Sequence, residues 1–174
     1  MSGQPEDFGN YFDDFEIGQV FKHPLGRTIS EADNTWFTLL TMNTNATHFD
    51  AHLSQHAEFG RMIVNSGLTL AIVLGQSVSD LSQHAFANLG WKEIKLLKPV
   101  FVGDTIYAES KIIGLKASES RPYAGIVTAL TRGLNQDGEI FMTYERSVYV
   151  YKRDGAPTAG HFPATDQPWA DEAE

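Results

Sequence analysis

The run S-G-L-T-L-A-I-V-L-G-Q-S-V, residues 66–78, decides the fold of this chain. Drawn as a helix it is apolar on nearly every side, so we expect a helix that begins near Ser66 and is buried all round rather than amphipathic. A helix of this kind is stable only when another layer of structure covers it. The flanking sequence must therefore supply that layer.

Two shorter helices are expected before this run. Ser30 is followed three residues later by Asp33, which is close to a capping box ahead of the apolar letters W-F-T-L-L. A second, shorter helix is predicted over residues 50–59. The first half of the chain is thus expected to be mainly helical.

The second half has the pattern of β-strands. Side chains alternate in character along residues 106–112 and again along 140–145, as in strands with one buried face. Asp137-Gly138 separates two such runs, which is a strong signal for a hairpin. Pro99 is expected to end one strand, and Gly103-Asp104 to turn the chain into the next.

These elements together predict an α+β fold, in which a curved antiparallel sheet wraps around a long central helix. We expect one domain over residues 1–174, with an ordered core from about 15 to 152 and irregular ends. A single sheet packed on one helix leaves an edge and a face to cover. Dimerisation is a natural solution, so a homodimer is expected.

The composition excludes several classes of protein. The chain has 174 residues and a net charge of −9, which argues against a general nucleic-acid surface. Its apolar runs are shorter than the ~18 residues of a membrane span, and its first ten residues lack a basic and apolar leader. There are no cysteines. We expect a cytoplasmic protein that binds neither nucleic acid nor membrane.

The residues that can do chemistry gather in the run F-T-L-L-T-M-N-T-N-A-T-H-F-D, residues 37–50. His48 is the side chain there whose ordinary pKa, ~6.5, allows proton transfer near neutral pH. For an isolated histidine, a structural loop residue bonded to a backbone carbonyl would be the better interpretation. His48, His52 and His56 also recur at helical spacing, but without the glutamate of H-E-x-x-H we expect no metal site.

Four stretches in matching order resemble the MaoC-like hydratases, the (R)-specific enoyl-CoA hydratases of the hot-dog fold. They are G-R-T-I-S-E-A-D at 26–33, the loop at 37–50, I-V-N-S-G-L at 63–68 and K-P-V-F-V-G-D at 98–104. The resemblance covers roughly residues 15 to 150. It implies a hot-dog domain, a homodimer with active sites near the subunit interface, and a CoA thioester as substrate with no further cofactor.

That family's catalytic loop reads approximately D-x-N-P-x-H-x-D. The resemblance places its histidine at His48, its asparagine at Asn45 and its catalytic aspartate at Asn43, where an amide cannot take a proton from water. We therefore expect His48 to carry the proton transfer and both asparagines to hold water or substrate. The resemblance also makes Gly67, at the start of the central helix, the donor to the thioester carbonyl; the alternative is a capping or close-packing glycine.

The letters T-M-N-T-N-A-T-H-F-D resemble the branch that hydrates branched C5 dicarboxylic CoA esters such as itaconyl-CoA or mesaconyl-CoA. The free carboxylate of such a substrate needs a cationic side chain, and Arg27 and Arg61 are the candidates nearest to the loop in sequence. Asp50 is either a missing carboxylate or, preferably, a helix cap. The residues we expect at the substrate are Asp50, Ser66, Arg61 and Arg27.

Three lysines close in sequence, Lys92, Lys95 and Lys98, are able to hold a phosphate, although solvated lysines are the simpler interpretation. The predicted function is reversible addition of water to a 2-enoyl-CoA. Two rivals stay open: an acyl-CoA thioesterase, since one fold hosts several chemistries, and a non-catalytic acyl-CoA-binding protein, since Asn43 replaces the expected carboxylate.

Overall fold

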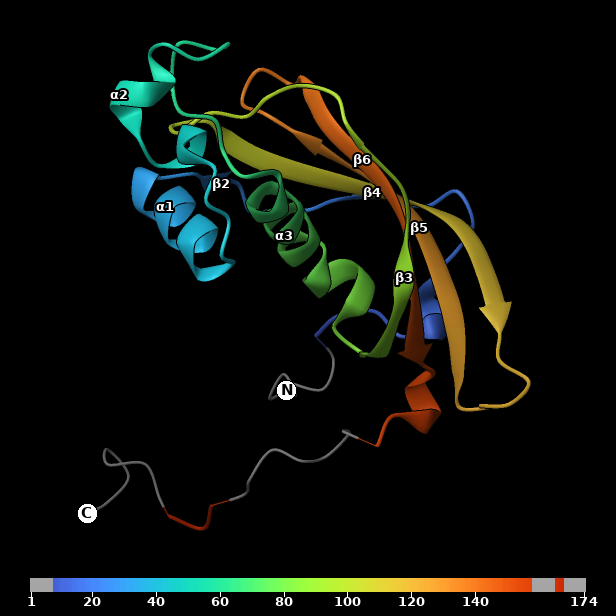
Figure 1. Cartoon of the computed structure of the whole chain (residues 1–174). Coiled ribbons are helices and arrows are strands. Elements are labelled where there is room, and N and C mark those ends of the chain that lie inside the picture. The colour runs from blue at the N-terminus through green and yellow to red at the C-terminus, as the bar shows by residue number, and fades with distance from the viewer. Residues whose placement is uncertain (1–7, 158–164, 168–174) are drawn as a thin grey trace.

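The computed structural model describes residues 8–157 and 165–167, and Figure 1 shows an antiparallel sheet that curves around one helix. That helix is α3, Ser66–Gln76. The strands run in the order β1-β4-β5-β6-β3, and β2 pairs with β4. Their bounds are β1 Val20–Lys22, β2 Arg27–Thr28, β3 Ala85–Leu96, β4 Thr105–Ala117, β5 Ala124–Leu134 and β6 Ile140–Tyr151.

The remaining helices lie on one side of α3 (Figure 1). Helix α1 spans Glu31–Leu40 and α2 spans Ala51–Ser54. The described residues also form short helical turns: η2 Phe12–Asp14, η3 Ala46–His48, the π-helical turn η4 Val78–Ser82, and η5 Arg153–Gly155. This architecture is the hot-dog fold, so the predicted fold class is confirmed.

The predicted helix start and hairpin are both present. Ser30 caps α1 by accepting the N–H of Asp33, and the Asp33 carboxylate accepts the N–H of Ser30, which completes the capping box. Strands β5 and β6 are joined by residues 135–139, where Gly138 has a φ of +76° that favours glycine. The local sequence therefore fixes both of these elements.

The strand predictions are also confirmed. Along β4 the side chains of Ile106, Ala108, Ser110 and Ile112 are buried beneath the curve of the sheet, while Tyr107 and Lys111 are exposed. After β3 ends at Leu96, Pro99 lies in an irregular connection, and the Asp104 carboxylate accepts the N–H of Phe101 in the turn that leads into β4.

One helix prediction is wrong in length and another is wrong in burial. The second helix ends at Ser54 instead of reaching residue 59, because the amides of His56, Ala57 and Gly60 bond only three residues back, as in separate turns. Helix α3 is not buried all round: Leu68, Thr69 and Val73 face the core, but Gly67, Ala71 and Gly75 are exposed. The reason is that one curved sheet covers only one side of a helix.

The chain before residue 15 is more ordered than expected. Tyr11 is 4% exposed and its ring stacks on His84 with centroids 3.8 Å apart. Arg153, after the last strand, pairs with Asp14. The predicted irregular tail falls largely outside the described residues. In the part of the chain that is described, no helix has the length and apolarity to cross a membrane.

Candidate active site

His48 sits at the end of η3, on the loop between α1 and α2, and its side chain is almost fully buried, with 8% of the residue exposed. The fully buried amide of Asn34, on α1, holds this loop. Its Nδ2 donates to the carbonyls of His48 (2.7 Å) and Ile63 (3.0 Å), and its Oδ1 accepts the N–H of Asn65 (2.9 Å). One side chain therefore ties the histidine loop to the start of α3.

The ring of His48 has a fixed orientation and tautomer. Its Nδ1 lies 3.0 Å from the carbonyl oxygen of Ile63. A carbonyl only accepts, so Nδ1 carries the proton and Nε2 is the unprotonated nitrogen of the neutral ring. No side chain or backbone group of the described residues bonds Nε2. The ring thus combines the structural bond of our alternative interpretation with a free basic nitrogen.

His48 forms part of the wall of a pocket of about 360 Å³ between the start of α3 and the chain that follows β3. Most of this wall is apolar, and its polar members besides His48 are Ser66, Thr69 and Lys98. An apolar hollow with a few polar groups is the usual form of a small-molecule site. The other lining residues are Phe59, Ile63, Val64, Leu96, Leu97, Pro99, Val100 and Phe141.

The N-terminus of α3 opens onto this pocket through Ser66. Asn65 caps the helix by accepting the N–H of Gly67 across 2.9 Å, so the predicted oxyanion donor is already hydrogen-bonded. A side chain at Gly67 would also crowd Asn65 and Phe37. Among the described residues no acceptor bonds the N–H of Ser66, the first residue of the helix. That N–H is the available donor at the positive end of the helix dipole.

Asn43 and Asn45 lie outside the pocket wall and organise the loop. The side-chain Oδ1 of Asn43 accepts the backbone N–H of Asn45 (2.9 Å). The side-chain Oδ1 of Asn45 accepts from the backbone N–H and the hydroxyl of Thr47. These are the local bonds that asparagine makes in turns. The Nδ2 of Asn43 stays available as a donor within the described structure, and the predicted catalytic roles of both residues stay predictions.

The other residues predicted to contact the substrate lie outside the pocket wall, apart from Ser66. Asp50 caps α2 by accepting the N–H of Leu53 (2.9 Å), which was our preferred interpretation. Arg61 does not line the pocket; its guanidinium lies 3.5 Å from the centre of the Phe101 ring, which contacts the lining residue Phe59 edge to face. Arg27 pairs with Asp33 and lines a different hollow, beside the C-terminal half of α3. Of the predicted substrate residues, the structure brings Ser66 together with His48.

The residues of the possible metal site do not form one. His52 and His56 contact each other edge to face, with centroids 5.4 Å apart, whereas His48 is turned into the pocket wall. Within residues 8–157 and 165–167, no group of three or more metal-binding side chains is present.

The structure also contains a network of hydrogen-bonded polar side chains that the sequence did not predict. Asp80 Oδ2 lies 2.5 Å from His23 Nδ1, His23 Nε2 lies 2.9 Å from Ser110 Oγ, and Ser110 bonds Thr131. The order is that of a serine hydrolase triad, but Ser110 is 2% exposed beneath the sheet and His23 is 4% exposed. A nucleophile closed off in this way cannot meet a substrate, so the network is structural.

The hot-dog fold, with His48 and the start of α3 on the wall of one pocket, agrees with the MaoC-like class of hydratases that the sequence resembles. A family model described as mesaconyl-CoA hydratase matches residues 3–174. The mesaconyl-CoA hydratase of Cereibacter sphaeroides is 40% identical over 157 residues, which is 87% of this chain and 44% of that protein. The chain therefore belongs to the mesaconyl-CoA hydratase family, within the MaoC-like hydratases.

Two further proteins show how the chain compares in size. The (R)-specific enoyl-CoA hydratase of Aeromonas caviae is 30% identical, across 76% of this chain and 93% of that enzyme. A solved structure of a putative MaoC domain protein dehydratase from Chloroflexus aurantiacus superposes with a TM-score of 0.81 at 34% identity, covering 97% of this chain and 47% of that one. The chain thus spans less than half the length of its mesaconyl-CoA hydratase relatives.

Proposed function

We propose that the chain catalyses the reversible addition of water to a 2-enoyl-CoA, with mesaconyl-CoA as the leading substrate. One observation carries the proposal: Nδ1 of His48 donates to the Ile63 carbonyl, so in the neutral ring Nε2 is the nitrogen able to accept a proton, and the ring lines an apolar pocket. Mesaconyl-CoA hydratase and (R)-specific enoyl-CoA hydratase activities belong to the relatives and support the choice of reaction.

In this proposal Nε2 of His48 takes a proton from water as the oxygen attacks the β-carbon of the thioester. Negative charge moves to the thioester oxygen. This oxygen accepts a hydrogen bond from the Ser66 N–H and is stabilised by the positive end of the α3 dipole. The Gly67 N–H contributes only if it exchanges its bond to Asn65. The protonated ring then returns the proton to the α-carbon, so water is added without any other reagent.

Asn43 is assigned the role of binding the attacking water. Its side-chain Oδ1 accepts the Asn45 N–H, which leaves Nδ2 to donate to the water oxygen. Asn45 acts by holding the loop. The pocket wall contains no aspartate or glutamate among the described residues, so His48 works without a second acid–base group. This absence also favours the rival role as an acyl-CoA-binding protein.

A panel of enoyl-CoA esters separates these functions. The protein is incubated with mesaconyl-CoA, itaconyl-CoA and crotonyl-CoA, and products are measured by mass while free thiol is assayed. A gain of one water without thiol release supports a hydratase. Thiol release indicates a thioesterase, and saturable binding without turnover indicates a binding protein.

We also propose that the domain pairs with a second copy of the chain along β3. This strand lies at the edge of the sheet, where β6 is its single neighbour in the described chain. It exposes several large apolar side chains, which are Phe86, Leu89, Trp91, Ile94 and Leu96. An exposed apolar edge of this length invites strand pairing. Sedimentation equilibrium tests it, and a monomer at micromolar concentration would contradict it.

A further inference from the structure

The pocket beside His48 has one cationic side chain among the described residues of its wall, and it is neither of the arginines expected from the sequence. That side chain is Lys98. Arg27 lines another hollow, and the guanidinium of Arg61 lies over the Phe101 ring. The other eleven residues of the wall include no lysine or arginine, so Lys98 is the cationic partner that this wall offers to an anionic group.

Backbone bonds fix the position of Lys98. It follows β3, and the amides of Leu97 and Lys98 both donate to the carbonyl of Phe141 on β6, at 2.8 and 3.3 Å. Phe141 itself lines the pocket. The segment that carries the lysine is therefore anchored to the sheet at the pocket.

The ammonium of Lys98 is paired with the carboxylate of Glu139, on the hairpin between β5 and β6. Hydrogen bonds from Lys98 and then from Asn135 hold the pKa of Glu139 below its usual value. Both side chains are about half exposed, at 49% and 48%. An exposed pair of this kind contributes little, so a second carboxylate can share or replace Glu139 at small cost.

We propose that Lys98 is the specificity residue of the pocket, and that it binds the free carboxylate of a dicarboxylic acyl chain. The proposal rests on the proposed function, in which the acyl chain lies in this pocket beside His48. A carboxylate that enters a mainly apolar hollow loses water and needs a charged hydrogen-bond partner. Lys98 supplies that partner, and Ser66 and Thr69 supply neutral polar groups on the same wall.

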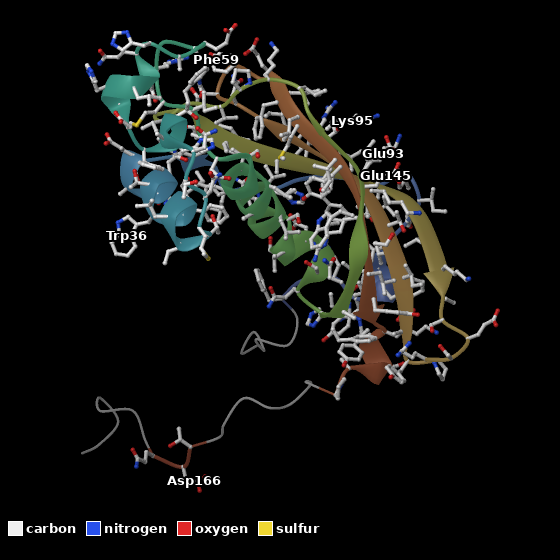
Figure 2. All side chains as sticks on the ribbon, in the orientation of Figure 1. Trp36, Phe59, Glu93, Lys95, Glu145 and Asp166 are labelled. Carbon is white, nitrogen blue, oxygen red and sulfur yellow. The ribbon has the colours of Figure 1, made fainter. Side chains whose placement is uncertain are left out.

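The test compares one dicarboxylic ester with one neutral ester. Mesaconyl-CoA and crotonyl-CoA share the CoA group and the reactive double bond, but only the first carries a free carboxylate. Lys98→Met is measured on both. Lys95→Met is the matched control, because Lys95 lies three residues earlier on β3, pairs with Glu93 and does not line the pocket (Figure 2).

Lys98→Met is expected to raise KM for mesaconyl-CoA by about 10- to 100-fold relative to crotonyl-CoA, the size of a lost charge-assisted hydrogen bond. Lys95→Met is expected to leave that ratio within about twofold, as for a solvated lysine. An equal rise for both esters would mean that Lys98 binds the CoA phosphates, and would overturn the proposal. A selective loss in Arg61→Gln instead would overturn it as well.

Binding of saturated esters keeps this inference separate from the proposed reaction. Methylsuccinyl-CoA and butyryl-CoA cannot be hydrated, and their affinities are measured by calorimetry with the same variants. If Lys98→Met weakens methylsuccinyl-CoA selectively while no ester is ever hydrated, Lys98 binds the carboxylate and the hydratase proposal fails. If crotonyl-CoA is hydrated but the wild-type protein shows no preference for a carboxylate, the hydratase stands and the Lys98 proposal fails.

Discussion

The side chain of Asn34 donates a hydrogen bond of 2.7 Å to the backbone carbonyl of His48, fourteen residues away on another element. The same amide reaches the carbonyl of Ile63 and the N–H of Asn65. The Ile63 carbonyl is also the acceptor for the His48 ring. One buried residue therefore positions both the proposed base, His48, and the carbonyl that orients its ring.

Asn34→Ala is therefore expected to lower the free energy of unfolding by about 3 kcal/mol, because it leaves the His48 carbonyl and the Asn65 N–H without partners at ~1–3 kcal/mol each and removes one of the two donors to the Ile63 carbonyl. Urea unfolding measures this loss. Thr35→Ala, at the next position of α1, is the control and should cost less than about 1 kcal/mol. Equal losses for the two variants would mean that the Asn34 bonds contribute nothing special.

The capping box of α1 predicts a pH-dependent stability. Bonds from the backbone and hydroxyl of Ser30, and then the charge of Arg27, lower the pKa of Asp33. A lowered folded-state pKa means stability that is present above the unfolded value of 3.8 and lost as pH falls through the folded value. Asp33→Asn should thus be less stable than wild type at pH 7, and the difference should shrink at pH 3. A constant difference in urea unfolding would contradict this.

The buried network of Asp80, His23 and Ser110 is expected to serve stability alone. Ser110→Ala should lower the free energy of unfolding by about 1–2 kcal/mol, since His23 loses a buried partner. The kcat of the protein should stay within about twofold, because Ser110 meets no substrate. Loss of thioester turnover in a variant that keeps its fold would instead make Ser110 a nucleophile.

Asn43→Asp tests the assignment of the water. A carboxylate at this position adds a second group able to accept a proton, so hydration should become about tenfold faster or more. Asn45→Asp is the control, because it makes the same change of charge two residues away on an exposed cap. Equal effects of the two variants would reflect charge alone, and no effect of Asn43→Asp would mean that Asn43 does not face the water.

The sequence predicts what local patterns determine. Alternation along β4, the Asp137-Gly138 hairpin and the Ser30–Asp33 capping box depend on neighbours a few residues apart, and each is present in the fold. The exposed stripe of α3 was missed because the sheet's coverage is a tertiary property. Trp36 shows the same limit: an apolar residue in a helix, it projects from α1 and is 69% exposed (Figure 2).

The site was predictable in part for the same reason. His48 stands out by residue type, and Ser66 lies at a predicted helix start. The roles of Asn34 and Lys98 depend on residues 14 to 41 positions away, which no local pattern encodes. The sequence signal for Asn34 is an asparagine inside a predicted helix, where this residue type is unfavourable unless its amide is used.

The most direct test of the account is the rate of mesaconyl-CoA hydration by His48→Ala, with circular dichroism and urea unfolding to establish that the variant is folded. Because Nε2 of His48 is the proposed base and acid, kcat should fall by at least ~10². A folded His48→Ala variant that still hydrates the ester within about threefold of wild type would contradict the account.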